Sequence, residues 1–185
     1  MGKIINSTFV SIDGVINHME AWHFAYIDDE SEQIALEQLQ ASQALLMGRR
    51  TYEAYASAWP QRDGVLADVI NSMPKYVASA TLDKATWNNT TVIKDDLVAE
   101  VTKLKRQGGD ILMNGFGPVA NTLIANGLLD VLHLWVHPRF AGIGGPGDLL
   151  LNEGNNTRLE LIGSRTLKSG IVLLSYRVPA GTSGA

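Results

Sequence analysis

Two arginines stand where the sequence predicts that a helix begins. In the stretch LLMGRRTYEAYASAW, an apolar strand is followed by a turn at Gly48, and a helix starts near Arg49, Arg50 and Thr51. The first turn of a helix carries unpaired N–H groups and about half a positive charge, so adjacent arginines are unfavourable there unless an anion offsets them. A phosphate bound by the amides, Thr51 and a guanidinium group would do so. The alternative is that Glu53 and solvent compensate the arginines.

A second strand-to-helix turn carries glycines instead. In DILMNGFGPVANTL, Gly115 and Gly117 flank Phe116, and Pro118 stands in the first turn of the following helix. Glycines would let a pyrophosphate approach the backbone and the helix start closely. The alternative is that they only permit the turn and close strand–helix packing.

The two turns together are more informative about a ligand site than either turn alone. If both strands run parallel in one sheet, both helices begin at the same carboxyl edge, where such sheets bind ligands. Two adjacent anion sites indicate a dinucleotide, and the arginines favour one with an additional phosphate. The predicted coenzyme is therefore NADPH rather than NADH.

A third glycine-rich stretch is not followed by a predicted helix. Residues 142–147, GIGGPG, match the pattern G-x-G-x-x-G. However, Pro146 and the following DLLLNEGNN do not predict a helix, so the strand–turn–helix context of a dinucleotide fingerprint is missing. We predict a mobile loop between strands.

Reduction of an imine by hydride also requires a proton, so carboxyl groups near the expected edge are candidate catalytic groups. Asp13 follows the first strand in SIDG, and Asp28 begins a predicted helix together with Asp29 and Glu30. Asp13 also fits a turn, and the acidic cluster also fits a helix N-cap. Trp22 is a candidate substrate contact, although large aromatic side chains usually belong to the core.

Composition excludes several other kinds of site. The chain has 185 residues, with 15 Lys+Arg against 19 Asp+Glu and no cysteine. Without cysteine there are no disulfides, thiolate zinc sites, iron–sulfur clusters or cysteine nucleophiles. A net charge of −4 with scattered bases gives no electrostatic surface for nucleic acid or an anionic membrane. His133 and His137 have no evident third metal ligand, so no metal site is predicted.

Hydrophobic periodicity predicts alternating strands and helices. The predicted strands cover residues 4–10, 44–47, 75–79, 90–93, 110–114 and 131–137, and the predicted helices cover residues 29–43, 50–58, 65–73, 95–107 and 118–126. A terminal hairpin is expected over 158–167 and 171–178. This pattern is typical of a three-layer α/β/α domain with a mostly parallel sheet and a C-terminal antiparallel hairpin.

One domain over residues 1–178 and a flexible tail over 179–185 are expected. The N-terminal residues predict a strand rather than a signal peptide, and no apolar run approaches the roughly 18 residues of a membrane span. The expected compartment is therefore the cytoplasm.

These stretches, in this order, resemble the dihydrofolate reductase-like superfamily. The motifs are SIDG after the first strand, MGRRTYE, VASAT, the Gly-x-Gly turn and LLDVLHLWVHPRFAGIG. The similarity is greatest to the bacterial branch that contains the reductase half of the riboflavin-biosynthesis deaminase/reductase. The Pro-Cys-x-x-Cys of the deaminase half does not occur in this sequence.

The resemblance implies an NADPH-dependent reductase of dihydrofolate reductase-like fold. It also implies that the turn Gly48-Arg49-Arg50-Thr51 holds phosphates of the coenzyme, and that Asp28 is the nearest counterpart of the family's helical carboxylate. The other implied contacts are Ser79, Ala80 and Thr81 near the adenosine 2′-phosphate, Gly115, Phe116, Gly117 and Pro118 near the pyrophosphate and nicotinamide, and Ser11, Asp13 and Gly14 near the nicotinamide and substrate. Homodimers are common in the riboflavin-type branch, so a homodimer is expected.

The resulting hypothesis is a reductase that transfers hydride from NADPH to a C=N or C=O bond of a small heterocyclic or ribosylaminopyrimidine-type substrate. Dihydrofolate reduction is the second hypothesis. A non-catalytic NADPH-binding protein on the same scaffold is the third, because a fold does not fix a function.

Overall fold

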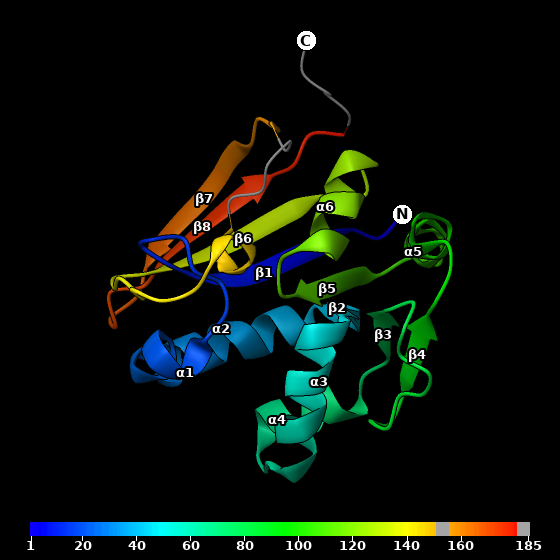
Figure 1. Cartoon of the computed structure of the whole chain (residues 1–185), viewed down its shortest axis with the longest axis horizontal. Helices are drawn as coiled ribbons and strands as arrows, with labels where there is room; N and C mark the ends of the chain where they lie inside the picture. Colours follow the sequence, from blue (N-terminus) through cyan, green and yellow to red (C-terminus); the bar gives the residue numbers. More distant parts are fainter. Residues whose placement is uncertain (151–155, 181–185) are drawn as a thin grey trace.

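An eight-stranded β-sheet runs through the molecule in the order β4-β3-β2-β5-β1-β6-β8-β7 (Figure 1). The computed structural model describes residues 1–150 and 156–180. The strands are β1 Ile4–Ser11, β2 Ser42–Gly48, β3 Lys75–Ala78, β4 Thr90–Ile93, β5 Asp110–Asn114, β6 Val131–His137, β7 Glu160–Thr166 and β8 Val172–Arg177. Strands β1 to β6 pair in parallel, whereas β8 is antiparallel to β6 and β7 to β8. This confirms the predicted mostly parallel sheet with an antiparallel hairpin.

Helices cover both faces of the sheet, which gives the three predicted layers. The helices are α1 Met19–Trp22, α2 Asp29–Gln40, α3 Arg49–Ala58, α4 Val65–Ser72, α5 Leu97–Arg106 and α6 Pro118–Ala125. In Figure 1, α1 to α4 lie on one side of the sheet and α5 and α6 on the other. Alternation along β2 explains this arrangement, because Leu45 and Met47 join the core under α2, α3 and α4, whereas Leu46 faces the core under α5 and α6.

Local sequence accounts for these elements. The four residues Ala44–Met47 are all buried, as expected for a parallel strand that is covered on both faces. α2 begins at a capping box, in which Asp28 Oδ1 accepts from the Ser31 N–H at 2.9 Å and the Ser31 hydroxyl accepts from the Asp28 N–H at 2.9 Å. The predicted capping role of the acidic cluster is thereby confirmed for Asp28.

The sheet changes winding direction between β2 and β5, which are parallel neighbours. After β2 the chain passes through α3 and α4 to β3 on one side, and after β5 it passes through α6 to β6 on the other. Helices α3 and α6 therefore begin at the same carboxyl edge but lie on opposite faces. Such a switch point is where open α/β sheets bind their ligands.

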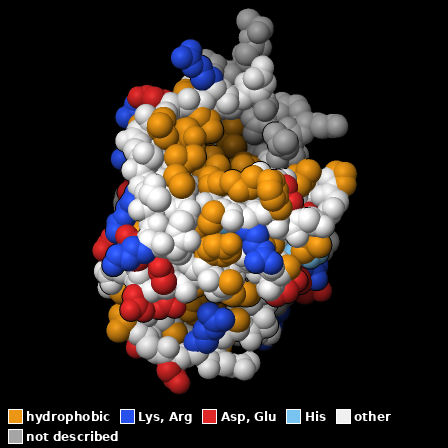
Figure 2. Space-filling view, turned by 90° about the vertical axis from the view of Figure 1, so that its left-hand side faces the viewer, with side chains coloured by type: hydrophobic (Ala, Val, Ile, Leu, Met, Phe, Trp, Pro, Cys, Tyr) orange, Lys and Arg blue, Asp and Glu red, His pale blue; other side chains and the backbone are white. Residues whose placement is uncertain are grey.

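The antiparallel end of the sheet has a different surface. One face of β6 and β8 packs through Trp135 and Leu173 against Ile34 of α2. The edge strand β7 is largely exposed, and Leu161 and Ile162 retain 56% and 46% of their accessible surface. Figure 2 shows apolar side chains gathered on the side of the molecule where β7 and β8 lie.

The structure adds short elements that periodicity did not predict. These are α1 and the 3-10 helices η1 Phe24–Tyr26, η2 Trp59–Gln61 and η3 Pro146–Asp148. The GIGGPG stretch leads only into the three residues of η3, so it is not a strand–turn–helix motif. Residues 181–185 of the predicted tail lie outside the described residues. No helix in the described ranges has the length and apolar character needed to cross a membrane.

Candidate functional site

The carboxyl ends of the parallel strands bring five loops into one row. In sheet order, these loops follow β3, β2, β5, β1 and β6. They comprise residues 79–81, 48–51, 115–118, 12–18 and 138–148. Strands β1 and β6 extend further than β5, because Ser7 pairs with Asn114 whereas Ser11 pairs with His137. The edge therefore has a step, with the β2 and β5 turns recessed beside the β1 and β6 loops.

The two predicted anion-binding turns touch one another. A Cβ atom on Gly115 would clash with Thr51 Oγ1, and the φ of 80° at Gly115 also favours glycine. The Gly115 carbonyl accepts a hydrogen bond at 2.8 Å from Nδ2 of Asn6, a buried residue of β1. The N-cap residues of α3 and α6 are Gly48 and Gly117, which have no side chain to cap the helix. Their first N–H groups are thus suited to an anion.

Arg49 links the β2 turn to the loop after β3. Its Nη1 donates to Thr81 Oγ1 at 2.7 Å, and its Nε donates to Glu53 Oε1 at 2.7 Å. The Ser79 hydroxyl accepts from the N–H groups of Thr81 and Leu82 at 3.3 and 3.1 Å. The loop after β3 is therefore folded around Ser79 and held against the arginine. Partial compensation by Glu53, the alternative considered from the sequence, is confirmed for Arg49.

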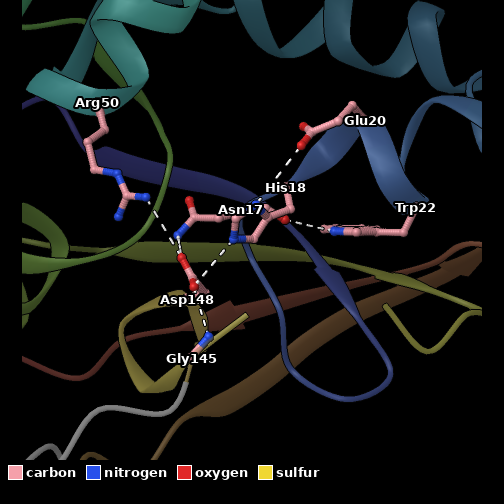
Figure 3. A network of polar contacts seen from close by, with 7 residues as sticks. All are labelled: Asn17, His18, Glu20, Trp22, Arg50, Gly145 and Asp148. Atoms are coloured by element: carbon pink, nitrogen blue, oxygen red, sulfur yellow. Dashed lines mark hydrogen bonds and ion pairs between the residues drawn. The ribbon is translucent and has the colours of Figure 1, made fainter. Parts of the chain in front are cut away.

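Arg50 extends in the opposite direction, toward the loops of β1 and β6. Its Nη2 lies 3.8 Å from Asp148 Oδ1, and its side chain is 75% exposed. Asp148 also accepts from Asn17 Nδ2 and from the Gly145 N–H, both at 2.9 Å (Figure 3). These two hydrogen bonds, with the Gly145 amide contributing most, hold the pKa of Asp148 at about 2. The two adjacent arginines thus contact different loops: Arg49 contacts the loop after β3, and Arg50 lies near the loop after β6.

Asp13 holds the loop after β6 through hydrogen bonds to its backbone. Its carboxylate accepts from the Ser11 hydroxyl at 2.6 Å and from the N–H groups of Ala141 and Gly142, both at 2.8 Å. These hydrogen bonds, with that of Ser11 the largest, lower the pKa of Asp13 to about 2. A group that is ionised at neutral pH is a poor acid, so a proton-donor role for Asp13 does not fit. The buried Ser11 hydroxyl is fully engaged, because it also accepts from the Val15 N–H.

Two further sequence candidates have structural roles. Asp28 uses its carboxylate to cap α2, which does not fit a catalytic acid. Trp22 is 2% exposed and donates from Nε1 to the Asn17 carbonyl at 2.8 Å, so a substrate contact through its ring does not fit either. Asp28 is a candidate from its position at a helix start and from the family resemblance, and Trp22 from its residue type, but only the fold shows that their polar atoms are already used.

A buried pair of histidines lies next to the β6 end of the row. His23 Nδ1 is 3.0 Å from His137 Nε2, and His137 Nδ1 is 3.0 Å from the Trp135 carbonyl. A carbonyl only accepts, so Nδ1 of His137 carries a proton and its Nε2 accepts from His23. Burial lowers the pKa of both rings, that of His23 to about 4. Within the described ranges no cluster of three metal-ligating side chains is found.

Sequence reasoning missed the polar residues that join the β1 and β6 loops. Asn17 and His18 both contact Asp148, which follows them by about one hundred and thirty positions. No local motif marks such a pair. The one available signal was the position of Asn17 and His18 shortly after a strand, at the edge where parallel sheets place their sites.

Comparison with known proteins decides the family. The model of the RibD C-terminal domain family matches residues 2–173. The chain belongs to this family. The protein YyaP of Bacillus subtilis (strain 168) is 30% identical over 138 residues, which cover 71% of this chain and 72% of YyaP.

Solved structures share the fold of this RibD C-terminal domain. A Shewanella sp. PV-4 protein whose name refers to riboflavin biosynthesis has a TM-score of 0.73 at 20% identity, covering 95% of this chain and 98% of that one. A pyrimidine reductase-like protein of Corynebacterium diphtheriae NCTC has a TM-score of 0.65 at 15% identity, covering 96% and 92%. The deaminase/5-amino-6-(5-phosphoribosylamino)uracil reductase of Thermotoga maritima has a TM-score of 0.63 at 15% identity, covering 96% of this chain and 56% of that one.

Proposed function

We propose that this protein is an NADPH-dependent reductase that acts on a C=N or C=O bond of a ribosylaminopyrimidine-type substrate. Membership of the RibD C-terminal domain family supports an oxidoreductase that uses a pyridine nucleotide. The observation that carries the proposal is the contact between the β2 and β5 turns at the switch point, where two uncapped helices begin.

The donor groups of this edge fit a phosphorylated dinucleotide. The N–H groups at the starts of α3 and α6 suit the pyrophosphate, and the missing side chain of Gly117 allows a close approach. At the β3 end, Arg49 with Thr81 and Ser79 offers a guanidinium group and two hydroxyls to the 2′-phosphate. This division assigns the discrimination between NADPH and NADH to Arg49, and assigns Arg50 to the nicotinamide side.

NADPH, when bound, supplies a hydride to the substrate. The chain itself binds, orients and shields the reacting groups. Asp13 fixes the backbone at Ala141 and Gly142, so the β1 and β6 loops form one continuous wall beside the recessed turns. Positioning of this kind turns a bimolecular reaction into one between held partners.

Coenzyme binding and turnover test the proposal with the purified protein. NADPH and NADH are titrated while tryptophan fluorescence and thermal unfolding are followed. The near-ultraviolet absorbance of NADPH is then monitored with 5-amino-6-(5-phosphoribosylamino)uracil and with dihydrofolate. We expect tighter binding of NADPH than of NADH, and oxidation of NADPH with the pyrimidine. Tight binding without turnover of either substrate would favour a binding protein, and equal affinity for both coenzymes would contradict the role of Arg49.

We also propose that the protein forms a homodimer through the antiparallel end of its sheet. The exposed Leu161 and Ile162 lie on the edge strand, where Leu161 pairs with the half-buried Tyr176 of β8. Exposed apolar edge strands promote association, and a two-fold axis lets one such surface cover its own copy. We expect light scattering after gel filtration to give a dimer, and Leu161→Lys to give a monomer. Val65→Lys, at a 63% exposed apolar residue of α4, is the control that should remain dimeric.

A further inference from the structure

One histidine in the loop after β1 has an unusual backbone. His18 adopts φ 55° and ψ 42°, the left-handed region that few residues with a side chain occupy. Such a conformation persists only where neighbouring contacts hold it, and it is frequent at functional sites. The contacts that hold His18 therefore indicate which side chains the loop after β1 is built to position.

These contacts converge on Asp148 (Figure 3). His18 Nε2 lies 3.4 Å from Asp148 Oδ2, while Asn17 Nδ2 donates to Asp148 Oδ1 at 2.9 Å. The Asn17 carbonyl is fixed in turn by Nε1 of the buried Trp22. Two successive residues are thus tied to one carboxylate, so the direction of the imidazole ring is set.

Charged groups from three elements lie around the ring. Asp148 is ionised, because the Gly145 and Asn17 hydrogen bonds hold its pKa at about 2. Glu20 Oε1 of α1 lies 4.0 Å from His18 Nδ1 and adds a second negative charge. Arg50 of α3 carries a positive charge, lies 3.8 Å from the other oxygen of Asp148 and is 75% exposed. The ring therefore lies beside an ionised carboxylate.

The ring also stands beside the proposed coenzyme site. Arg50 belongs to the β2 turn, and His18 and Arg50 approach the two oxygens of the same carboxylate. With Nε2 directed at Asp148, Nδ1 lies on the other side of the ring, where Glu20 Oε1 is 4.0 Å away, beyond hydrogen-bonding distance, and 41% of the side chain is exposed. A substrate bound between the β1 loop and the β2 turn would therefore meet Nδ1.

We propose that His18 is the proton donor of the reduction and that Asp148 is its positioning residue. The inference rests on the proposed reductase function. Reduction of a C=N bond adds a hydride to carbon, and the π electrons move to nitrogen. That nitrogen takes the proton from Nδ1 of the His18 imidazolium, which becomes neutral and is reprotonated by solvent. The coenzyme is oxidised and the substrate reduced, so atoms and electrons balance.

Other acids near the edge do not meet the same requirements. Asp13 is ionised and bound to two amides, and Asp28 caps a helix. His23 and His137 are buried and hydrogen-bonded to each other. Among these groups of the described chain, His18 alone combines exposure with an ionised partner.

The variant His18→Asn tests the proposal, because asparagine tolerates the left-handed backbone but carries no titratable proton. We expect kcat to fall about 10²- to 10⁴-fold, the usual contribution of a general acid, with little change in KM or in NADPH affinity. In Asp148→Asn we expect kcat to fall with little change in KM, because the ring loses the carboxylate that orients it. His18→Gly leaves space for added imidazole, which should restore part of the activity. His133→Gln, at the far end of β6, is the matched control that should retain full turnover.

A second readout does not depend on turnover. The imidazole C2–H resonance of His18, assigned by its loss in His18→Asn, should shift on addition of NADP⁺, whereas that of His133 should not. A His18 resonance whose chemical shift does not change at saturating NADP⁺ would overturn the inference. A wild-type kcat in His18→Asn would overturn it too. A wild-type protein that binds NADPH but reduces nothing contradicts both proposals, whereas turnover retained without His18 contradicts only this one.

Discussion

Arg49 donates from Nη1 to Thr81 Oγ1 at 2.7 Å, which joins the β2 turn to the loop after β3 across the boundary of two paired strands. Its neighbour Arg50 reaches toward Asp148 on the other side of the row of loops. Adjacent arginines of one motif therefore have separable functions, and the first prediction depends on this difference.

Arg49→Ala is expected to weaken NADPH binding about ten- to hundred-fold and to leave NADH binding nearly unchanged. The reason is the loss of a charge-assisted contact to the 2′-phosphate, which NADH lacks. Arg50→Ala should affect both coenzymes to a similar degree, and Arg106→Ala, at the end of α5, should affect neither. Fluorescence titration measures all three, and an equal loss for both coenzymes in Arg49→Ala would disprove the assignment.

Gly115→Ala is expected to destabilise the fold by about 1–3 kcal/mol and to reduce coenzyme affinity, because the new Cβ meets Thr51 Oγ1. Gly64→Ala is a matched control. Its φ is 104°, but its Cβ would meet no atom within 4 Å, so it reports backbone strain alone. Urea unfolding of both variants separates the two effects. Removal of the hydroxyl in Gly115→Ala/Thr51→Ala should recover part of the loss, and a double variant no better than the single one would contradict the contact.

Most of the fold was predictable because its strands and helices are locally encoded. The run Ala44–Met47 is apolar because both faces of β2 are covered, and α6 begins at Pro118 where a missing N–H costs nothing. The hairpin β7–β8 followed from two strand-like runs around Lys168-Ser169-Gly170. α1 could not be predicted from periodicity, because its four residues span little more than one turn.

The site was predictable only in part. The glycine and arginine turns carry a local signal, since a helix start has a known electrostatic character. The roles of Asp13 and Asp148 depend on partners more than one hundred residues away, such as Ala141 and Asn17. Its residue type and its position after the first strand make Asp13 a candidate acid, but three hydrogen bonds make it an ionised anchor.

Lys75→Met should cost about 2–4 kcal/mol of unfolding free energy, measured by urea denaturation. Lys75 is 1% exposed, and its Nζ donates to the carbonyls of Asn71, Met73 and Asn88 at 2.8–3.2 Å. Methionine keeps the length of the side chain but leaves these acceptors without a donor. Lys94→Met is the control, since Lys94 is 46% exposed and should change stability by less than about 0.5 kcal/mol. A Lys75→Met protein as stable as the control would contradict the role of this buried cation.

Acid should destabilise the protein through the His23–His137 pair. Burial lowers the pKa of His23 from 6.5 to about 4, so the unfolded chain binds a proton that the folded chain excludes. Stability must therefore fall as pH drops through 6.5 and continue to fall until about pH 4. Between about pH 7.5 and about pH 5 the loss from His23 alone amounts to about 2 kcal/mol, and His137 adds to it in the same direction.

Urea unfolding at the two pH values measures this loss, and His23→Phe should reduce it by about 2 kcal/mol, because the ring that must be kept neutral is gone. Asp13 and Asp148 do not interfere. Their pKa values are lowered from 3.8 to about 2, so the stability they contribute is lost only as pH falls below the range compared. Unfolding free energies that are equal at both pH values in the wild type would show that the buried pair accepts a proton without cost, contrary to its burial and its hydrogen bond.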